Sequence, residues 1–480
     1  MCKEGEEEEI LTMKKMWRGA GAAALATALV AVQNVASAQG SSVGSSTVTS
    51  PVVQQGDHDP FYDTAGLAAG EPGEVLKTAQ AAYSNIFGPY HYNLPRTATK
   101  IMYSTLNSVG ESTPVTGYVV EPVTPWSGPG PRPTLVIGRG TVGQGDQCAP
   151  SKNWPLDGQP DPVAAGRLVN LEGLYDWIFA SNGVRVVVTD YVGMGTPGVH
   201  TYMNKDDQAH AMLDAARAAR EIVQGNGQEF GQVGFYGHSQ GGGASAAALE
   251  TAATYAPDLS VAGGYASAPP ADLDAVQRNI DGSDLVGAIG FTINGLLERF
   301  PHLPPMLDEH LSTQGHQTLN RLADMCTREI TEEFGYQTTD QWTTTGQRLD
   351  ELLADLPEAR EAMDAQFIGH GKPVAPAMIV SGQHDLNVEY LQGKQLAQRW
   401  CAAGGAVVYR DDFMPKIGEY NHFAQAVTGG VFGMQFMLDR FRNKPVVGAC
   451  AIPDAPPGSV EGSVAGSGEM AITGSQVTGS

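Results

Sequence analysis

The chain has 480 residues, of which 42% are hydrophobic and 17% are charged, so it is long and apolar enough to bury a large core. Its formal net charge of -23 leaves no basic surface for nucleic acid, and anionic membrane faces would repel it. We therefore expect one large folded domain with insertions that does not bind nucleic acid.

The N-terminus has the pattern of an export signal over residues 1–38. Basic residues precede an apolar run at 20–32, and Ala36-Ser37-Ala38 offers a small-residue cleavage site. The run of about 13 residues is shorter than the ~20 that span a bilayer, so we expect cleavage after Ala38, a secreted protein and no transmembrane segment. An acidic run precedes the basic residues, which favours Met13 as the true start.

Beyond a polar linker at 39–58, the pattern alternates strands with helices. Predicted strands cover 99–106, 115–121, 133–137, 183–189, 232–236, 259–267, 379–381 and 406–409. Predicted helices cover 208–222, 242–253 and 430–441. This alternation predicts an α/β fold with a mostly parallel sheet that is covered on both faces.

Residues 273–368 show no strand pattern. They predict helices over 285–300, 318–333 and 345–363. We expect a helical cap inserted over the carboxyl edge of the sheet, which divides the core into 59–272 and 369–450. The apolar run 285–297 would suit a lipid-like substrate or transient contact with a lipid interface, although packing against its own domain is the commoner explanation. The Pro-, Gly- and Ser-rich residues 451–480 predict a flexible tail.

The segment Gly237-His238-Ser239-Gln240-Gly241 matches the GxSxG turn that carries a nucleophilic serine. Because the chain contains 59 glycines, the bare pattern is weak, and Gly40-Ser41-Ser42-Val43-Gly44 also matches it. Only the match at Ser239 has an apolar strand before it and a small-residue helix after it. We therefore predict that Ser239 is the nucleophile.

A serine nucleophile needs a base and an acid, which in this fold class follow it in the order acid, then histidine. Asp385 follows the strand at 379–381, and His422 lies in a predicted loop between the strand at 406–409 and the last helix. We predict that Asp385 orients His422 and that His422 takes the serine proton. The rival acids are Asp190, Asp411 and Asp412, and the rival bases are His238, His302, His310, His316, His370 and His384; they fit the order or the strand-end placement less well.

An oxyanion hole would complete this site. We expect one donor from the backbone N–H of Gln240 and a second from the glycine-rich loop 138–145, with Thr141 as the candidate. The loop lacks the Gly-Lys-Ser/Thr ending of a phosphate-binding loop, and no metal-ligand spacing is present. We expect no cofactor.

The chain has five cysteines, and removal of Cys2 with the signal leaves an even number. In an oxidising compartment we expect Cys148, Cys326, Cys401 and Cys450 to form disulfides in one of three pairings, against the alternative of four buried free thiols.

These motifs resemble the secretory lipase family, with its yeast lipase A-like and actinobacterial members. The likeness rests on the serine turn, on Cys148-Ala-Pro-Ser151, on the segment 190–198, and on Gly382-Gln-His-Asp385 with His422. It implies an α/β-hydrolase core with a helical cap and hydrolysis of acylglycerols or other carboxylic esters. It also implies that Cys148 pairs with Cys326, which leaves Cys401 and Cys450 for each other. The yeast members carry an acidic residue in the oxyanion loop where this chain has Gly-Thr-Val at 140–142.

The expected function is hydrolysis of carboxylic esters by a secreted serine lipase or esterase. Two alternatives remain open at this point. One is a short-chain or acetyl esterase, or an acyltransferase, that uses the same site. The other is a non-catalytic cell-wall or binding protein built on a hydrolase scaffold.

Overall fold

The computed structural model describes residues 59–68, 70–84, 94–156 and 172–454. The predicted signal peptide, the linker and most of the predicted tail lie outside these ranges and stay predictions. Within the described ranges, no helix is both long enough and apolar enough to cross a membrane.

A nine-stranded sheet organises the described part of the chain, in the order β1-β2-β3-β5-β4-β6-β7-β8-β9. The strands are β1 Val75–Ala82, β2 Thr97–Leu106, β3 Ser112–Val120, β4 Thr134–Gly138, β5 Arg185–Thr189, β6 Val233–His238, β7 Val261–Ser267, β8 Ala377–Gly382 and β9 Val407–Asp412. The first four in this order pair antiparallel, and β5 to β9 pair parallel. The central strands β4, β5, β6 and β8 are buried along their whole length, as their continuous apolar sequences predict.

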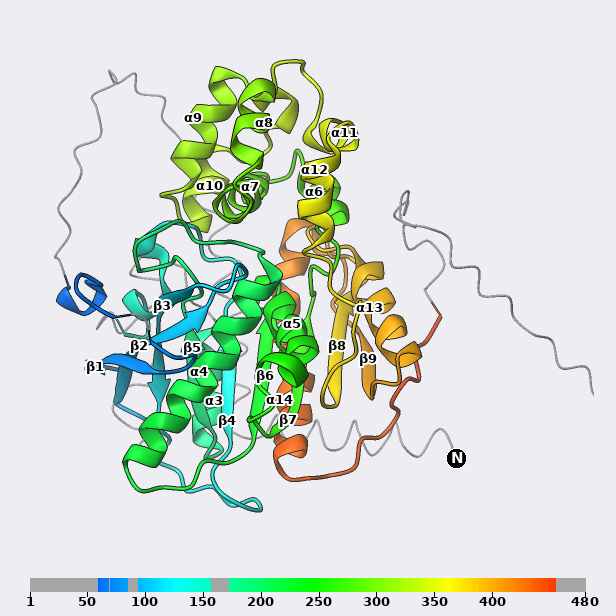
Figure 1. Ribbon diagram of the computed structural model, residues 1–480. Helices are drawn as coiled ribbons and strands as arrows, with labels where there is room; N and C mark the ends of the chain where they lie inside the picture. The colour runs from blue at the N-terminus through cyan, green and yellow to red at the C-terminus, as the bar shows by residue number, and fades with distance from the viewer. Residues whose placement is uncertain (1–58, 69, 85–93, 157–171, 455–480) are drawn as a thin grey trace, which may run out of the picture.

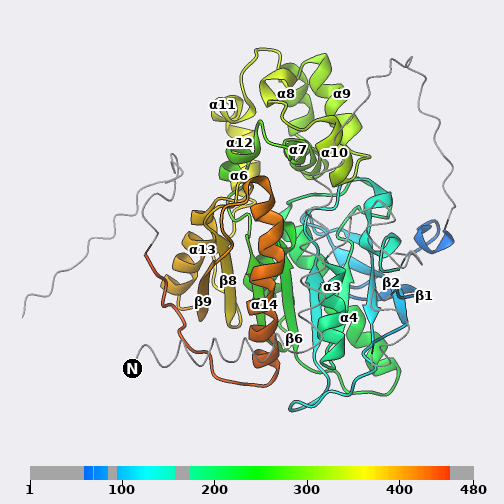
Figure 2. The ribbon, with the colours of Figure 1, turned by 180° about the vertical axis from the view of Figure 1, so that it is seen from behind.

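Helices cover both faces of the sheet (Figures 1 and 2). One face packs against α4 Lys205–Gly225, α5 Gln240–Tyr255 and α13 Tyr390–Ala402, and the other packs against α3 Gly173–Ser181 and α14 Asn421–Phe441. Small side chains allow close packing, since a Cβ on Gly433 of α14 would overlap the ring of Tyr265. The two hydrophobic cores lie on opposite faces of the sheet.

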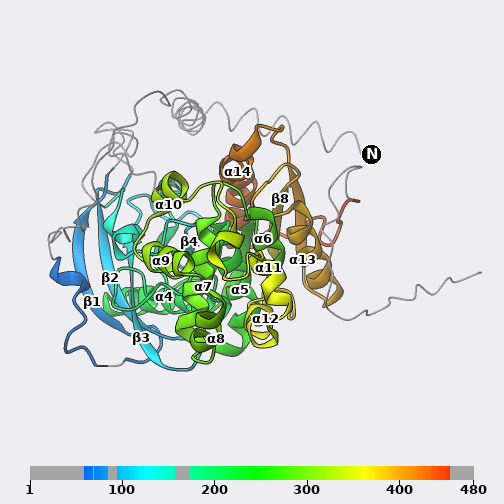
Figure 3. The same cartoon turned by 90° about the horizontal axis from the view of Figure 1, so that it is seen from above.

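A group of helices lies between β7 and β8 and sits over the end of the sheet where the parallel strands finish (Figures 1 and 3). These are α6 Leu273–Ile280, α7 Gly287–Arg299, α8 Leu303–His310, α9 Thr313–Leu322, α10 Thr327–Glu333, α11 Leu349–Ala354 and α12 Pro357–Asp364. We call residues 273–364 the cap segment. It has a hydrophobic cluster of its own. Tyr202 and Met203, from the segment between β5 and α4, also belong to this cluster.

Short 3-10 helices complete the described elements. They are η1 Pro60–Tyr62, η3 Asp146–Cys148, η4 Pro150–Lys152, η5 Thr339–Trp342 and η6 Gly418–Tyr420.

The predicted strands are confirmed to within a few residues, but β1, α3, α6, α8 and α13 escaped prediction. Two predicted helices were wrong as single elements. The helix expected at 318–333 is interrupted at 323–326, where Cys326 pairs with the glycine loop, and the one expected at 345–363 is split before Pro357, which starts a new helix. Short helices therefore replace the longer ones.

Candidate active site

Ser239 occupies a sharp turn between β6 and α5. Its φ of 56° lies in the left-handed region, which is unusual for a residue other than glycine. A Cβ on Gly237 would overlap the backbone of Gly241, and a Cβ on Gly241 would overlap the carbonyl oxygen of Gly138. The turn therefore requires glycine at both positions, because the strand, the helix and the end of β4 nearly touch.

His422 bridges the serine and Asp385. Its Nε2 lies 2.8 Å from Ser239 Oγ, and its Nδ1 lies 2.8 Å from Asp385 Oδ2. A carboxylate only accepts, so Nδ1 carries the proton and Nε2 accepts from the serine hydroxyl. The three predicted triad side chains thus form one continuous hydrogen-bonded chain.

The predicted loop position of His422 was wrong, because it is the second residue of α14. The Asn421 side chain accepts from the N–H of Ile417 and donates to the carbonyl of Pro415, which closes the preceding turn onto the helix start. The helix therefore begins nine residues earlier than the apolar pattern suggested.

Asp385 is buried and fixed from two sides. Its Oδ1 accepts the backbone N–H groups of Asn387 at 2.8 Å and Val388 at 3.0 Å, while Oδ2 faces His422. The rival acids have other partners: Asp190 accepts from Thr116 and Ser151, and Asp411 accepts from Tyr390.

His238, the rival base beside the nucleophile, is buried, and its Nδ1 lies 3.0 Å from Ser267 Oγ. Burial lowers the pKa of its imidazole well below the usual value, and the neighbouring His422 adds to this shift. The two rings pack with their centroids 4.7 Å apart. His238 is therefore a neutral neighbour of His422.

The glycine-rich loop after β4 lies against the serine turn. A Cβ on Gly140 would come within 3.4 Å of the His238 carbonyl oxygen. Among the described residues, neither the N–H of Thr141 nor that of Gln240 has a hydrogen-bond acceptor. The Thr141 hydroxyl lies 2.7 Å from the hydroxyl of Tyr202. Each predicted oxyanion donor thus has a free backbone N–H in the described part of the chain, Gln240 as the neighbour of Ser239 in sequence and Thr141 in the loop that lies against the serine turn.

A buried polar network supports the residue after the nucleophile. The Gln240 side chain donates to His200 Nε2 at 3.0 Å, and His200 Nδ1 donates to the carbonyl of Val192. Burial lowers the pKa of His200 to about 4, so its ring is neutral and can accept at Nε2. Gln144 donates both to the His200 carbonyl and to the Phe291 carbonyl of α7. Sequence reasoning missed this network, because His200 lies in no motif and the glycine-rich loop that contains Gln144 was read for its backbone groups alone.

Two disulfides are present, Cys148–Cys326 and Cys401–Cys450, in the pairing implied by the resemblance. The first joins the cap segment to η3, directly after the glycine loop, and Gly143 of that loop pairs with Cys326 through a β-bridge. Over the ranges the structure describes, no three His, Cys, Asp or Glu side chains gather to hold a metal ion.

Comparison with known proteins identifies the family. Residues 168–449 match the sequence profile of the family described as "Secretory lipase". A protein of Mycobacterium tuberculosis named "Probable inactive lipase MT1628" is 27% identical over 395 residues, which cover 81% of this chain and 83% of that protein. "Secreted triacylglycerol lipase LIP1" of Malassezia furfur is 22% identical over 412 residues, covering 83% of this chain and 78% of that protein.

The fold matches solved structures. Candida antarctica lipase A in its closed state has a TM-score of 0.69 at 20% identity, over 82% of this chain and 88% of that one. The rice cell wall degrading esterase LipA from Xanthomonas oryzae has a TM-score of 0.63 at 18% identity, over 78% of this chain and all of that one. The fold is that of the α/β-hydrolases, as predicted. Since the profile spans more than half of the chain, the protein belongs to the secretory lipase family.

Proposed function

We propose that this protein is a secreted serine ester hydrolase that cleaves carboxylic esters, acylglycerols among them, through an acyl-enzyme. The observation that carries the proposal is the chain of 2.8 Å contacts from Asp385 through His422 to Ser239. Family membership supports a lipase or esterase, and the two disulfides support an oxidising, extracellular setting.

In the proposed reaction, Ser239 Oγ attacks the ester carbonyl while its proton passes to His422 Nε2. The free N–H groups of Gln240 and Thr141 donate hydrogen bonds to the tetrahedral oxygen and stabilise its negative charge. His422 then gives the proton to the leaving alcohol, and Asp385 stabilises the transient imidazolium. A water molecule, deprotonated by His422, releases the acid from the serine by the reverse sequence.

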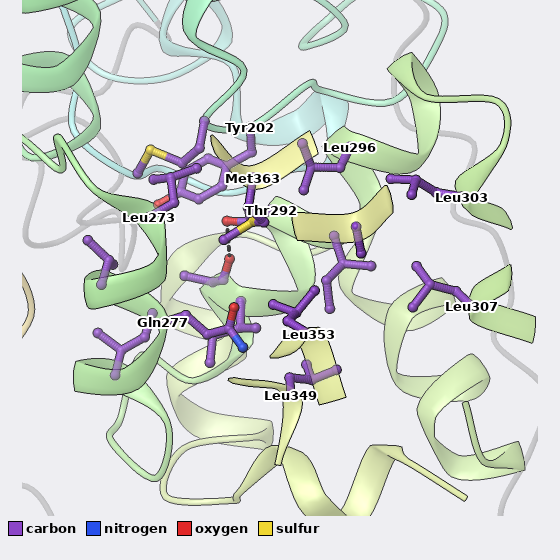
Figure 4. A pocket seen from close by; sticks show the side chains of 17 residues that line it. Tyr202, Leu273, Gln277, Thr292, Leu296, Leu303, Leu307, Leu349, Leu353 and Met363 are labelled. Atoms are coloured by element: carbon purple, nitrogen blue, oxygen red, sulfur yellow. Dashed lines mark hydrogen bonds between the residues drawn. The ribbon is translucent and has the colours of Figure 1, made fainter. Parts of the chain in front are cut away.

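A cavity in the cap segment supports an acyl-chain substrate. It measures about 60 Å³, and its walls are mostly aliphatic side chains of several cap helices that point toward one space, including Leu296, Leu303, Leu349 and Leu353 (Figure 4). Tyr202 lines the cavity and also contacts Thr141 of the loop beside Ser239. We infer that the acyl chain enters this cavity from the serine.

The cavity volume bears on the alternative of a short-chain esterase. An apolar cavity of about 150 Å³ holds one benzene molecule, so about 60 Å³ admits only a few carbon atoms unless the cap helices move apart. We therefore expect short acyl chains to be the preferred substrates of this arrangement. An acyltransferase would share the acyl-enzyme and differ in the acceptor alcohol.

Because one relative is named as a probable inactive lipase, the alternative of a non-catalytic protein needs a direct test. Covalent labelling of the nucleophile distinguishes an active enzyme from a non-catalytic one. We expect an organophosphonate to label the wild-type protein stoichiometrically at Ser239. Hydrolysis of p-nitrophenyl butyrate should disappear in Ser239→Ala and persist in Ser245→Ala, a matched change one to two turns along α5 where the buried hydroxyl has no hydrogen-bond partner. Full hydrolysis by Ser239→Ala would refute the proposal.

A further inference from the structure

Glu172 connects α3 to the glycine loop. It precedes the first residue of α3, yet its side chain does not cap that helix. Instead its Oε2 accepts the backbone N–H of Gly140 at 2.6 Å, from a segment 32 residues away. A carboxylate that precedes a helix ordinarily accepts hydrogen bonds from the N–H groups in the first turn of that helix. The orientation of Glu172 therefore calls for another explanation.

The peptide group between Arg139 and Gly140 is held at both ends. Its carbonyl oxygen accepts from the hydroxyl of Tyr191 at 2.8 Å, and its N–H donates to Glu172. Two peptide groups further on, the carbonyl of Thr141 accepts from the Thr327 hydroxyl at 2.8 Å. The peptide group between them carries the free N–H of Thr141. That N–H is therefore oriented by its fixed neighbours.

Glycine at position 140 makes the anchor necessary. Without a Cβ the backbone rotates more freely, so the next peptide plane could turn away unless its neighbours are held. The Arg139 side chain cannot do this, because its guanidinium is buried in an ion pair with Asp176 at 2.6 Å. Burial raises the pKa of Glu172 to about 6, against the effect of Arg139 and of the Gly140 N–H. At neutral pH the bond to Gly140 is therefore charge-assisted.

We propose that Glu172 is a positioning residue of the ester hydrolysis, which fixes the Arg139–Gly140 peptide so that the Thr141 N–H faces the oxyanion. This inference rests on the proposed function. Glu172 acts through the loop backbone, since its side chain accepts from the Gly140 N–H and, among the described residues, makes no hydrogen bond to Ser239.

The test compares Glu172→Ala, which removes the acceptor, with Glu172→Gln, which keeps an uncharged acceptor. Because loss of one oxyanion donor costs about 10²- to 10³-fold in kcat, we expect Glu172→Ala to lower kcat about 10- to 100-fold with KM nearly unchanged. We expect Glu172→Gln to lower kcat about fivefold, since a neutral hydrogen bond is weaker than a charge-assisted one.

Glu221→Gln is the matched control. Its carboxylate accepts the N–H of Val75 at 3.0 Å, at the far edge of the sheet, so the same chemical change should leave kcat unaltered. A folded Glu172→Ala with wild-type kcat would overturn the inference, as would losses that appear only in KM. If Glu172→Ala does not fold, Glu172→Gln with the kcat of the wild type overturns it. Failure of the wild type to react with the phosphonate would refute the proposed function itself.

Discussion

The cap cavity predicts how the rate depends on acyl-chain length. If about 150 Å³ holds the six carbons of benzene, about 60 Å³ holds two to three methylene groups. Each methylene that leaves water for an apolar site gains about 0.8 kcal/mol, which is about fourfold in kcat/KM. From acetate to butyrate or valerate the gain should reach about 2 kcal/mol, or about 30-fold, and longer chains should add little.

Filling the cavity tests this reasoning. Ala288 of α7 lines the cavity and is buried, so Ala288→Leu places three further carbon atoms in it. We expect kcat/KM for p-nitrophenyl acetate to change little, while the gain from acetate to butyrate falls below about fivefold. Ala362→Leu makes the same change in the buried layer of the cap segment, outside the cavity lining, and should preserve the wild-type chain-length profile.

Thermal unfolding of each variant separates lost packing from a filled cavity. The reasoning is refuted if folded Ala288→Leu keeps the gain for butyrate. It is also refuted if the wild-type rate rises undiminished to octanoate, because the cavity would then not limit the chain.

Two further predictions concern the disulfides and the pH profile. Loop-closure entropy gives about 5 kcal/mol for Cys148–Cys326, with a sequence separation of 178, and about 4 kcal/mol for Cys401–Cys450, with a separation of 49. Replacing either pair of cysteines by alanine should lower Tm in a calorimetric scan. Only loss of Cys148–Cys326 should also lower kcat, since that bond holds the glycine loop in place. Equal kcat values in the two double variants would contradict this. For the pH profile, burial raises the pKa of Glu172 to about 6, although the charges of Arg139 and His422 act against this rise. Protonation of Glu172 removes the charge assistance from its bond to the Gly140 N–H, so the ratio of wild-type to Glu172→Gln kcat should fall toward one as the pH drops through this pKa, and a ratio that does not change across it would refute the reasoning. The other titratable groups that interact with Glu172 are Asp176, Tyr175, Tyr191, Tyr236 and Tyr265.

The parallel strands were readable from the sequence because each buried strand is a short apolar run, whereas their order in the sheet was not predicted. The edge strand β1 was not, since its sequence Val-Leu-Lys-Thr-Ala-Gln-Ala-Ala has weak alternation and only partial burial. Helix α13 was missed because the pattern after Asp385 mixes polar and apolar residues, and several of its polar side chains, Gln392 and Lys394 among them, are buried. Burial of polar groups is a tertiary outcome that periodicity cannot signal.

The proposed triad could be predicted from the sequence, whereas the residues that hold the site in place could not. Ser239 is marked by local backbone geometry, and Asp385 and His422 by their order after strands, so each carries information in its own segment. Glu172 carries none: it precedes an unpredicted helix, and its partner is a backbone N–H of a glycine, a group that every residue but proline possesses. The oxyanion donor that it would orient is likewise a backbone group. A sequence can therefore reveal the side chains proposed to attack the substrate and to transfer protons. The residues that orient a backbone N–H become visible only when the chain is folded.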